Sequence, residues 1–491
     1  MSRWVTGLTM SMMAGMALAA WTGAAAGVYV LLGMVAFIIF CSLFPDRRRI
    51  KTGLISVLAL GSGLLLYTHE YREWQRLPEH SEFSGLVEII ELGQVKVFYR
   101  PMTLRPKTDD WVGGDILYRA PIDVSGVPGE QLEFGCQLTR PENFEPGFDY
   151  RLLLVTRGVG YVCERGGVSR VLPNEDRHIR TLLYAVQSGF RDRVNQLLPE
   201  PESGLLAGLL IGGSDTLVSE TKTAFARSGL SHIVAVSGYN MSVVAEGLVI
   251  LALVLGLWRR FAVGIAIIGL AGFLLVIDGS AASLRAALMA WLAFGAYFVG
   301  RPAASWNGLL IAGVGMLVFN PLLIRYDIGF QLSFLATLAL LILARSFETF
   351  DFFRRWYGKL VALFSTTVVI ELFTLPVILS AFGTVSLIAP VANVLVLPLV
   401  PIAMFAGIAA VALTALLPGF AHLFMLLVWL PLTLIIRLAE GMAAFSWASL
   451  GLSEGGLDNH PSFAVLWYAG IGLAVYLFER FRKRYVLGVD H

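Results

Sequence analysis

The sequence predicts a polytopic α-helical membrane protein with about twelve crossings and one small inserted all-β domain on the outer side. Three observations lead to this prediction. The 491 residues are 56% hydrophobic and only 15% charged, with a mean hydropathy of +0.71, which is far more apolar than a soluble domain. Repeated apolar runs approach the roughly 20 residues that a helix needs to cross a bilayer. One segment, residues 82–171, instead carries charges, prolines, glycines and short alternating runs.

Residues 1–68 are expected to form three membrane helices, from apolar runs at 4–20, 28–44 and 54–67. A basic cluster separates the second run from the third: Arg47, Arg48, Arg49 and Lys51. Because basic residues favour cytoplasmic loops, we expect the N-terminus and this cluster in the cytoplasm and residue 69 onward outside. A cleaved signal peptide is the alternative for the first run, which follows Arg3 and ends in small residues.

We place the outer β domain at residues 69–178. The runs VKVFYR, DILYR, QLEFGCQLT and YRLLLVT are short, β-rich and bounded by turn residues, which predicts about five strands. A barrel of the oligonucleotide-binding (OB) kind fits this size, and so does a small sandwich. Acidic side chains slightly outnumber basic ones here, so the charge does not indicate a phosphate-binding surface.

Two of the three cysteines, Cys136 and Cys163, lie in this β domain, and Cys41 lies in the second apolar run. Outside a membrane, two cysteines in one small domain form a disulfide more often than a metal site, which needs further ligands. We therefore predict a Cys136–Cys163 disulfide, with two buried free thiols as the alternative.

Residues 179–227 are expected to be interfacial. One helical face of 180–198 carries Leu183, Val186, Phe190, Val194 and Leu197. Such a stripe suits a helix that lies on the membrane surface, and equally a helix packed on the β domain. The run 205–211 is closed by Gly212 and Gly213 and is too short to span, so it predicts a re-entrant or interfacial element.

Residues 228–485 form the main membrane block, and 486–491 a short cytoplasmic tail. Its basic clusters fall on one predicted side, and the loop 446–462, which lacks lysine and arginine, falls on the other. Pro376, Pro390, Pro398 and Pro401 lie in or beside the later runs, which indicates broken helices or simple kinks. The apolar runs of the block are 233–257, 263–277, 282–299, 308–323, 328–343, 360–379, 388–416, 421–438 and 463–478.

The stretch SGLSHIVAVSGYNMSVVAE, residues 228–246, is the most polar part of this block. Polar side chains in the hydrocarbon core are costly unless they meet protein or water, and the Ser237–Gly238 pair loosens the helix where it can bend. A bent polar helix of this kind is typical of a pathway lining.

Five separated stretches form a series of motifs along the chain. They begin at Pro146 (PGFDYRLLLVTRGVG), Gly229 (GLSHIVAVSG), Ser283 (SLRAALMA), Gly329 (GFQLSFLA) and Leu375 (LPVILSAFGTVSLIAPVANVLVLPLVP). The last four resemble successive motifs of the ComEC family, the inner-membrane DNA channel of natural transformation, and the first resembles the end of that family's outer domain. The resemblance implies an outer OB-type domain, a competence membrane block and the passage of one DNA strand into the cytoplasm.

The sequence departs from this family in two ways. The family usually has a histidine where Asn240 stands, so a role that needs an imidazole is in doubt there. Many members also end in a metallo-β-lactamase-like domain, whereas no His-x-His-x-Asp-His run occurs here. We therefore expect no enzyme activity, no metal and no cofactor, and a separate nuclease. Because no P-loop is present, the motor must be a separate cytoplasmic ATPase, and an outer DNA receptor is also expected.

A path for single-stranded DNA needs hydrogen-bond donors and spaced positive charge to meet the phosphates. Local structure is the alternative role for several polar residues: Arg325 can pair with Asp327, Asn320 can cap a helix, and His232 can bond a carbonyl. The candidates for the DNA path are His232, Ser237, Asn240, Arg285, Arg325, Gln331, Ser333 and Asn393.

Two other functions fit parts of this pattern. An ion-coupled secondary transporter of a small anionic solute would use broken helices, with Glu246 or Glu371 as coupling sites. An intramembrane hydrolase could combine His232, Ser237 and Asp278, but the chain carries no recognisable nucleophile motif. As DNA-path residues, Glu246 and Glu371 would repel phosphate if ionised, so we expect them to be paired, protonated or turned toward another element.

Overall fold

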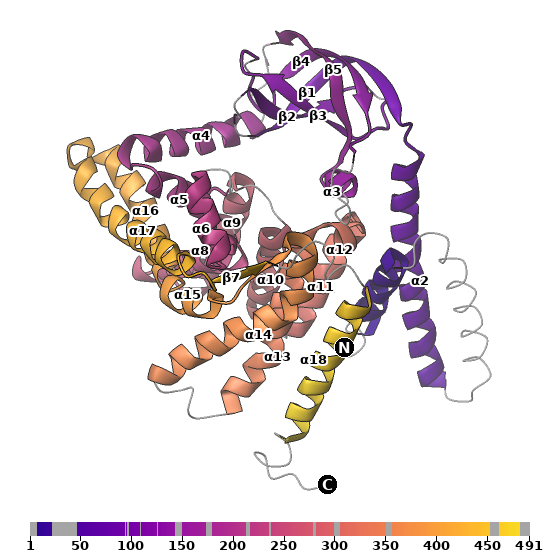
Figure 1. Ribbon diagram of the computed structural model, residues 1–491, viewed down its shortest axis with the longest axis vertical. Coiled ribbons are helices and arrows are strands. Elements are labelled where there is room, and N and C mark those ends of the chain that lie inside the picture. The colour runs from indigo at the N-terminus through magenta and orange to yellow at the C-terminus, as the bar shows by residue number, and fades with distance from the viewer. Residues whose placement is uncertain are drawn as a thin grey trace. The chain divides into compact units, whose positions relative to one another are not determined.

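The computed structural model describes residues 7–21, 47–93, 95, 98–108, 110–124, 126–142, 150–172, 179–212, 217–234, 237–277, 281–298, 305–349, 356–451 and 461–481 (Figure 1). The predicted run 28–44, Cys41, Asp278 and most of the loop 446–462 lie outside these residues. The chain divides into two compact units, one of Met1–Gly189 with Trp291–Phe330 and one of Phe190–Ala290 with Gln331–His491.

The β domain of the first unit is a closed five-stranded barrel, which agrees with the predicted barrel and not with a sandwich. The strand order around the barrel is β1-β2-β3-β5-β4, and β3 and β5 pair in parallel while the other neighbours are antiparallel. The strands are β1 (His80–Leu92), β2 (Tyr99–Pro106), β3 (Asp115–Pro121), β4 (Gln131–Thr139) and β5 (Val159–Leu172).

Alternation of side chains along the strands fills the barrel. In β4 every second residue is buried, from Leu132 through Phe134 and Cys136 to Leu138. A disulfide joins Cys136 on β4 to Cys163 on β5, with the two Cα atoms 5.9 Å apart. The bond therefore fixes two neighbouring strands of the barrel to each other.

The structure differs from the predicted β domain in one strand and at its N-terminal end. The run YRLLLVT is a helix, α3 (Tyr150–Thr156), in which Val155 is buried in a cluster with Tyr67 and Leu322. The third N-terminal run continues as α2 (Arg47–Arg76), so residues 69–76 are helical. Its last turns stay ordered by packing, since Trp74 contacts the cluster and the Arg140 guanidinium donates to the carbonyl oxygens of Trp74 and Gln75.

The N-terminal helix, Gly7–Trp21, packs against α2 through small residues. A Cβ atom on Gly15 would collide with the Leu60 carbonyl, and one on Gly63 would collide with the Met12 carbonyl. Glycine at both positions therefore allows the two backbones to approach closely, as in packed membrane helices.

The amphipathic helix is α4 (Ile179–Leu197), and the boundary between the two units falls inside it. Its first turns attach to the barrel by polar contacts: Arg180 Nη1 lies 2.6 Å from Glu88 Oε1, and Thr181 Oγ1 donates to the Pro128 carbonyl. Farther along, Val194 is buried and Phe190 packs in the core of the second unit. Both halves of α4 thus contact protein, the first through its polar side chains.

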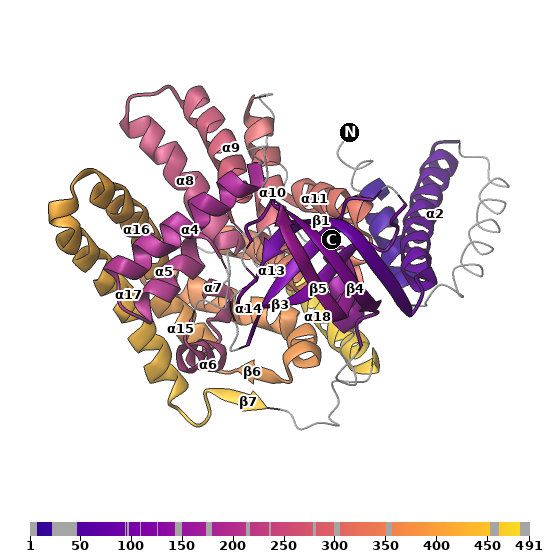
Figure 2. The ribbon, with the colours of Figure 1, turned by 90° about the horizontal axis from the view of Figure 1, so that it is seen from above.

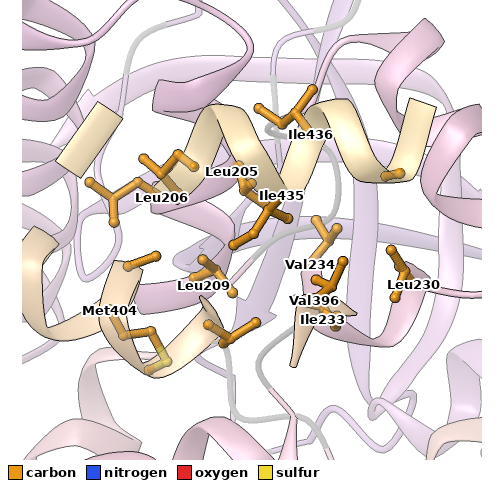
Figure 3. Packing of buried hydrophobic residues seen from close by; sticks show 14 of the residues in the cluster. Leu205, Leu206, Leu209, Leu230, Ile233, Val234, Val396, Met404, Ile435 and Ile436 are labelled. Carbon is orange, nitrogen blue, oxygen red and sulfur yellow. The ribbon is translucent and has the colours of Figure 1, made fainter. Parts of the chain in front are cut away.

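That core, in the second unit, surrounds α5 (Glu202–Leu210), all nine residues of which are buried. Leu205, Leu206 and Leu209 lie among side chains of three other helices, α7 (Ser231–Val234), α16 (Leu399–Leu416) and α17 (Ala421–Ala443) (Figure 3). A helix that is buried on every face packs inside a core, and the interfacial and re-entrant roles of α5 stay predictions. A re-entrant element remains compatible with this burial.

Most other helices of the described residues overlap the predicted apolar runs, while two short ones, at 219–227 and 323–326, lie largely outside these runs. The other helices are α6 (Ser219–Arg227), α7 (Ser231–Val234), α8 (Gly238–Val254), α9 (Arg259–Val276), α10 (Ala281–Phe298), α11 (Ser305–Phe319), α12 (Leu323–Tyr326), α13 (Ile328–Thr349), α14 (Trp356–Phe382), α15 (Ala389–Val396), α16 (Leu399–Leu416), α17 (Ala421–Ala443) and α18 (Pro461–Phe481).

Four helices in the described residues are long and apolar enough to cross a membrane: Arg259–Val276, Ala281–Phe298, Leu360–Phe382 and Leu423–Ala443. A bent pair of helices, α15 with α16, makes a fifth if it counts as one span, and its axis turns by 42° at the break. Shorter apolar helices cover five further segments. The count of about twelve crossings stays a prediction.

Two helices of the second unit are interrupted. The predicted run 233–257 divides into α7 and α8, and Ser237 precedes α8 in an extended conformation, as the Ser-Gly pair predicted. The run 388–416, predicted as one crossing, divides at Leu397–Pro398, whereas Pro376 and Pro431 lie inside continuous helices.

A short sheet of two strands, β6 (Thr384–Ser386) and β7 (Ser449–Gly451), connects α14 and α17 (Figure 2). The Ser386 hydroxyl donates to the Arg227 carbonyl at the end of α6 and lies 3.3 Å from the Ala448 carbonyl. Gly229, with φ of 75°, lies against Ser386 and Ala389. The chain is therefore fixed by these contacts just before α7.

Candidate functional site

Arg285 is the predicted path residue with the most unusual surroundings. It lies on α10 and is only 8% exposed. Its Nε donates to the Ser333 hydroxyl of α13 at 2.7 Å, and its Nη1 lies 3.3 Å from the Met289 sulfur. The structure thus brings together two predicted residues that are 48 positions apart in the sequence.

No carboxylate of the described residues forms an ion pair with Arg285; its two partners are a hydroxyl and a thioether. A guanidinium carries a full charge at any physiological pH, and a buried charge is costly unless it is paired. Neither a serine nor a methionine can neutralise it. This site therefore holds a buried positive charge without a counter-charge from the described part of the chain.

The first residue of α8 borders this guanidinium. A Cβ atom built on Gly238 would lie 2.9 Å from Arg285 Nη2, so the arginine lies against the backbone at the N-terminus of α8. Ser237 is the N-cap: its Oγ accepts from the Asn240 backbone amide at 3.4 Å. The partial positive charge of the helix N-terminus adds to that of the arginine.

Asn240 is buried and points into protein instead of into this site. Its Nδ2 donates to the Leu209 carbonyl of α5 at 3.2 Å, and its Oδ1 accepts from the Ser237 hydroxyl at 3.2 Å. The amide side chain thereby ties α8 to α5. This buried position gives no support to the predicted contact of Asn240 with DNA. The two hydrogen bonds of the side chain indicate a structural role instead.

Three further predicted path residues of the second unit are His232, Gln331 and Asn393. The exposed His232 ring has Nδ1 3.1 Å from the Gly229 carbonyl, so the local role predicted as its alternative is present. Gln331 begins the second turn of α13, two residues before Ser333. Asn393, on α15, is 5% exposed, and its Oδ1 has no hydrogen-bond partner in the part of the chain that the structure describes. A donor from water or another molecule would satisfy that oxygen.

Arg325 lies in the first unit, in α12, and has local contacts. Its Nη1 donates to the Ala20 carbonyl, and its guanidinium lies 5.4 Å from the Tyr326 ring centre. Asn320 caps this region as expected, with Oδ1 accepting from the Leu322 amide and Nδ2 donating to the Thr156 carbonyl. Asp327 accepts from the Phe330 amide at the start of α13.

Two further polar contacts of the second unit were missed. Glu202, at the start of α5, is buried and accepts from Thr433 Oγ1 of α17 at 2.6 Å. Tyr239 reaches the Leu397 carbonyl with its hydroxyl at 3.3 Å. The only sequence signal for Glu202 was its position as a single acidic residue before an apolar run. Nothing in the sequence indicated that Thr433 is its partner.

The described residues give no support to either alternative function. Ser237 bonds to Asn240 and His232 bonds to Gly229, so these two side chains do not form a nucleophile and base pair here. Glu246 is exposed on α8, and Glu371 is half-buried on α14. No group of three or more potential metal ligands occurs among the described residues.

The fold and the site define a class: a helical protein with apolar spans, interrupted helices and a buried cation beside a helix N-terminus. A family model described as "Competence protein" matches residues 209–481. Because this match covers more than half of the chain, the chain belongs to the competence-protein family, the ComEC family.

One relative is ComE operon protein 3 of Bacillus subtilis (strain 168). It is 25% identical over 300 residues, which cover 60% of this chain and 38% of the relative. The chain therefore spans much less than two thirds of that relative. No solved structure matches the chain.

Proposed function

We propose that this protein conducts single-stranded DNA across the bacterial cytoplasmic membrane during natural transformation. The family of the chain supports this proposal, and so does the name of the relative, a protein of a competence operon. The observation that carries it is the buried Arg285, which has no counter-charge among the described residues and lies beside the interrupted helix. A strand with one negative charge per phosphate is the kind of ligand that such a charge favours.

The contacts favour conduction over catalysis. Conduction needs a ligand to be held briefly and released, so hydroxyls, a helix N-terminus and one cation suffice. In this proposal the protein is not an enzyme and uses no cofactor. A separate nuclease supplies the single strand, a separate outer receptor delivers DNA, and a cytoplasmic ATPase drives the movement.

The proposed orientation places the barrel on the outer side and the basic clusters in the cytoplasm, with about twelve crossings. Membrane lipid then surrounds the exposed apolar side chains of helices such as α9 and α17. The disulfide in the barrel supports an outer location, because such bonds persist in oxidising compartments.

Uptake in cells tests the function directly. The gene is deleted, and labelled DNA inside the cytoplasm is measured separately from DNA bound at the cell surface. We expect internalisation to be lost and surface binding to remain. Unchanged internalisation would exclude the channel. An ion-coupled transporter would instead move a small anion into vesicles that hold the purified protein, and an ion gradient would drive that movement.

A further inference from the structure

We propose that the N-terminus of α8 and the Arg285 guanidinium form one site that holds a single phosphodiester group of the passing strand. This inference rests on the proposed function and names the residues that contact the backbone. It adds two main-chain amides, those of Gly238 and Tyr239, to the arginine that the sequence indicated.

The first step concerns the amides. The first N–H groups of a helix have no partner within the helix. In α8 the cap satisfies the third position, since the Asn240 amide bonds to Ser237 Oγ. The amides of Gly238 and Tyr239 have no hydrogen bond to the described residues. Two such donors at the positive end of a 17-residue helix suit an oxyanion.

The second step concerns the arginine, an independent observation. Its side chain is more than nine-tenths buried, and two of its three nitrogens are engaged with Ser333 and Met289. The third, Nη2, is the one that lies against Gly238. The guanidinium is therefore held by Nε and Nη1 while Nη2 remains available at the helix N-terminus. A phosphate there would receive hydrogen bonds from the fork and from the amides together.

The third step concerns Gly238. The backbone dihedral φ of Gly238 is not positive, so it does not require glycine. The limited space beside the residue does require glycine. A side chain of any size would displace the guanidinium from the amides, since even a Cβ atom comes within 2.9 Å of Nη2. Glycine at this position thus keeps the arginine and the helix N-terminus close enough to share one ligand.

The salt dependence of binding tests the site. The probe is fluorescent dT15, bound to the purified full chain in nanodiscs and followed by anisotropy at several salt concentrations. For single strands, each phosphate contact contributes about 0.7 to the slope of log K against log salt. We expect Arg285→Gln to lower the slope by about this amount, and Gly238→Ala to lower affinity at every salt concentration. Arg285→Lys should keep the slope and lose affinity.

Matched controls separate the site from general damage. Arg260→Gln removes an exposed arginine at the start of α9, and Gly264→Ala adds a methyl group where nothing lies within 4 Å. Both should leave slope and affinity unchanged. A dT15 with an uncharged methylphosphonate backbone should not distinguish Arg285→Gln from the unmodified protein.

The outcomes also separate this site from the proposed function. A normal slope in a folded Arg285→Gln protein would overturn the site, and so would normal affinity in Gly238→Ala. If Arg285→Gln does not fold, Arg285→Lys and Gly238→Ala still decide the result. The deletion experiment in cells measures the function separately: loss of uptake on deletion with an unaltered slope in the variants would keep the channel and reject the site.

Discussion

At the scale of single residues, neighbouring positions in one motif have different roles. Gly238 borders the charged guanidinium of Arg285, whereas Asn240, two residues later, connects α8 to α5. The difference follows from helix geometry, because residues i and i+2 point to different faces of a helix. One face of this turn meets the cation, and the other meets the core.

The first prediction concerns Asn240. Asn240→Leu removes the donor to the Leu209 carbonyl and the acceptor for Ser237, and a buried group left without its partner costs about 1–3 kcal/mol. We expect a lower midpoint of thermal unfolding for the purified protein. Asn240→His should lose less, because a ring N–H can donate to the same carbonyl. Asn195→Leu, at an exposed position of α4, is the control, and an equal effect there would contradict this account.

The second prediction concerns pH and Glu88, a buried carboxylate on β1. Burial raises its pKa, but the hydrogen bond from Lys107 at 2.5 Å and the charge of Arg180 lower it by more, so the net pKa lies below the ordinary value for glutamate. A depressed pKa contributes stability that is present above the ordinary value of about 4.3 and is lost as the pH falls through the folded value. We therefore expect α4 to stay attached to the barrel at a pH equal to the ordinary glutamate pKa. It should loosen only in more acidic solution.

Hydrogen-exchange protection of residues 179–188, corrected for the intrinsic pH dependence of exchange, measures this attachment. Glu88→Gln should weaken the protection near neutral pH by about 1 kcal/mol, since solvent screens the partly exposed cations. It should also remove the acid dependence. Glu133→Gln, an exposed carboxylate on β4, is the control. Protection that does not change with pH in the unmodified protein would refute the prediction.

At the scale of elements, a small β domain was predictable, but its closure into a barrel and several neighbouring elements were not. Alternating apolar residues specify a strand with one buried face, and β4 shows this pattern fully. YRLLLVT has the same β-rich composition, yet it folds as α3, because Val155 is buried against α2 and α12 segments and not in the barrel. Tertiary packing overrides local preference in a segment as short as this.

The helix breaks show a similar limit. Ser237–Gly238 was predicted as a weak point and is the start of α8. Prolines gave less information: Pro398 lies at a break, but Pro376 and Pro431 lie within helices. A proline breaks a helix only where the freed backbone groups find no local partner, which depends on the surrounding helices. The bond from Arg285 to Ser333 could not be read from one sequence either, because nothing local links positions 48 residues apart.

The third prediction concerns the disulfide between β4 and β5. If the protein is denatured in the presence of a thiol label and without a reductant, Cys41 alone should react until a reductant is added. Labelling of three cysteines without a reductant would show that the bond is absent. Cys136→Ser should destabilise the barrel by roughly 2–5 kcal/mol, whereas Cys41→Ser should leave the barrel unchanged.

At the scale of the whole molecule, topology is the main open prediction. The basic residues Arg345, Arg354, Arg355 and Lys359 favour the cytoplasm, and the loop around Gly456 lacks lysine and arginine. A reporter fused after Lys359 should therefore be active in the cytoplasm, and one fused near Gly456 should be active outside. Reporters of opposite activity, such as an alkaline phosphatase and a fluorescent protein, measure this at each site. Reversed readings would refute the proposed orientation.

The closure of the barrel limits how partners can bind to it. In an open sheet, the last strand offers a row of unpaired amides and carbonyls to which an extended peptide can add as another strand. Here β1 pairs with both β2 and β4, so the barrel is closed and none of its five strands is an edge strand. A partner must therefore recognise side chains and loops of the barrel, and the same closure protects the domain from edge-to-edge aggregation while the rest of the chain folds.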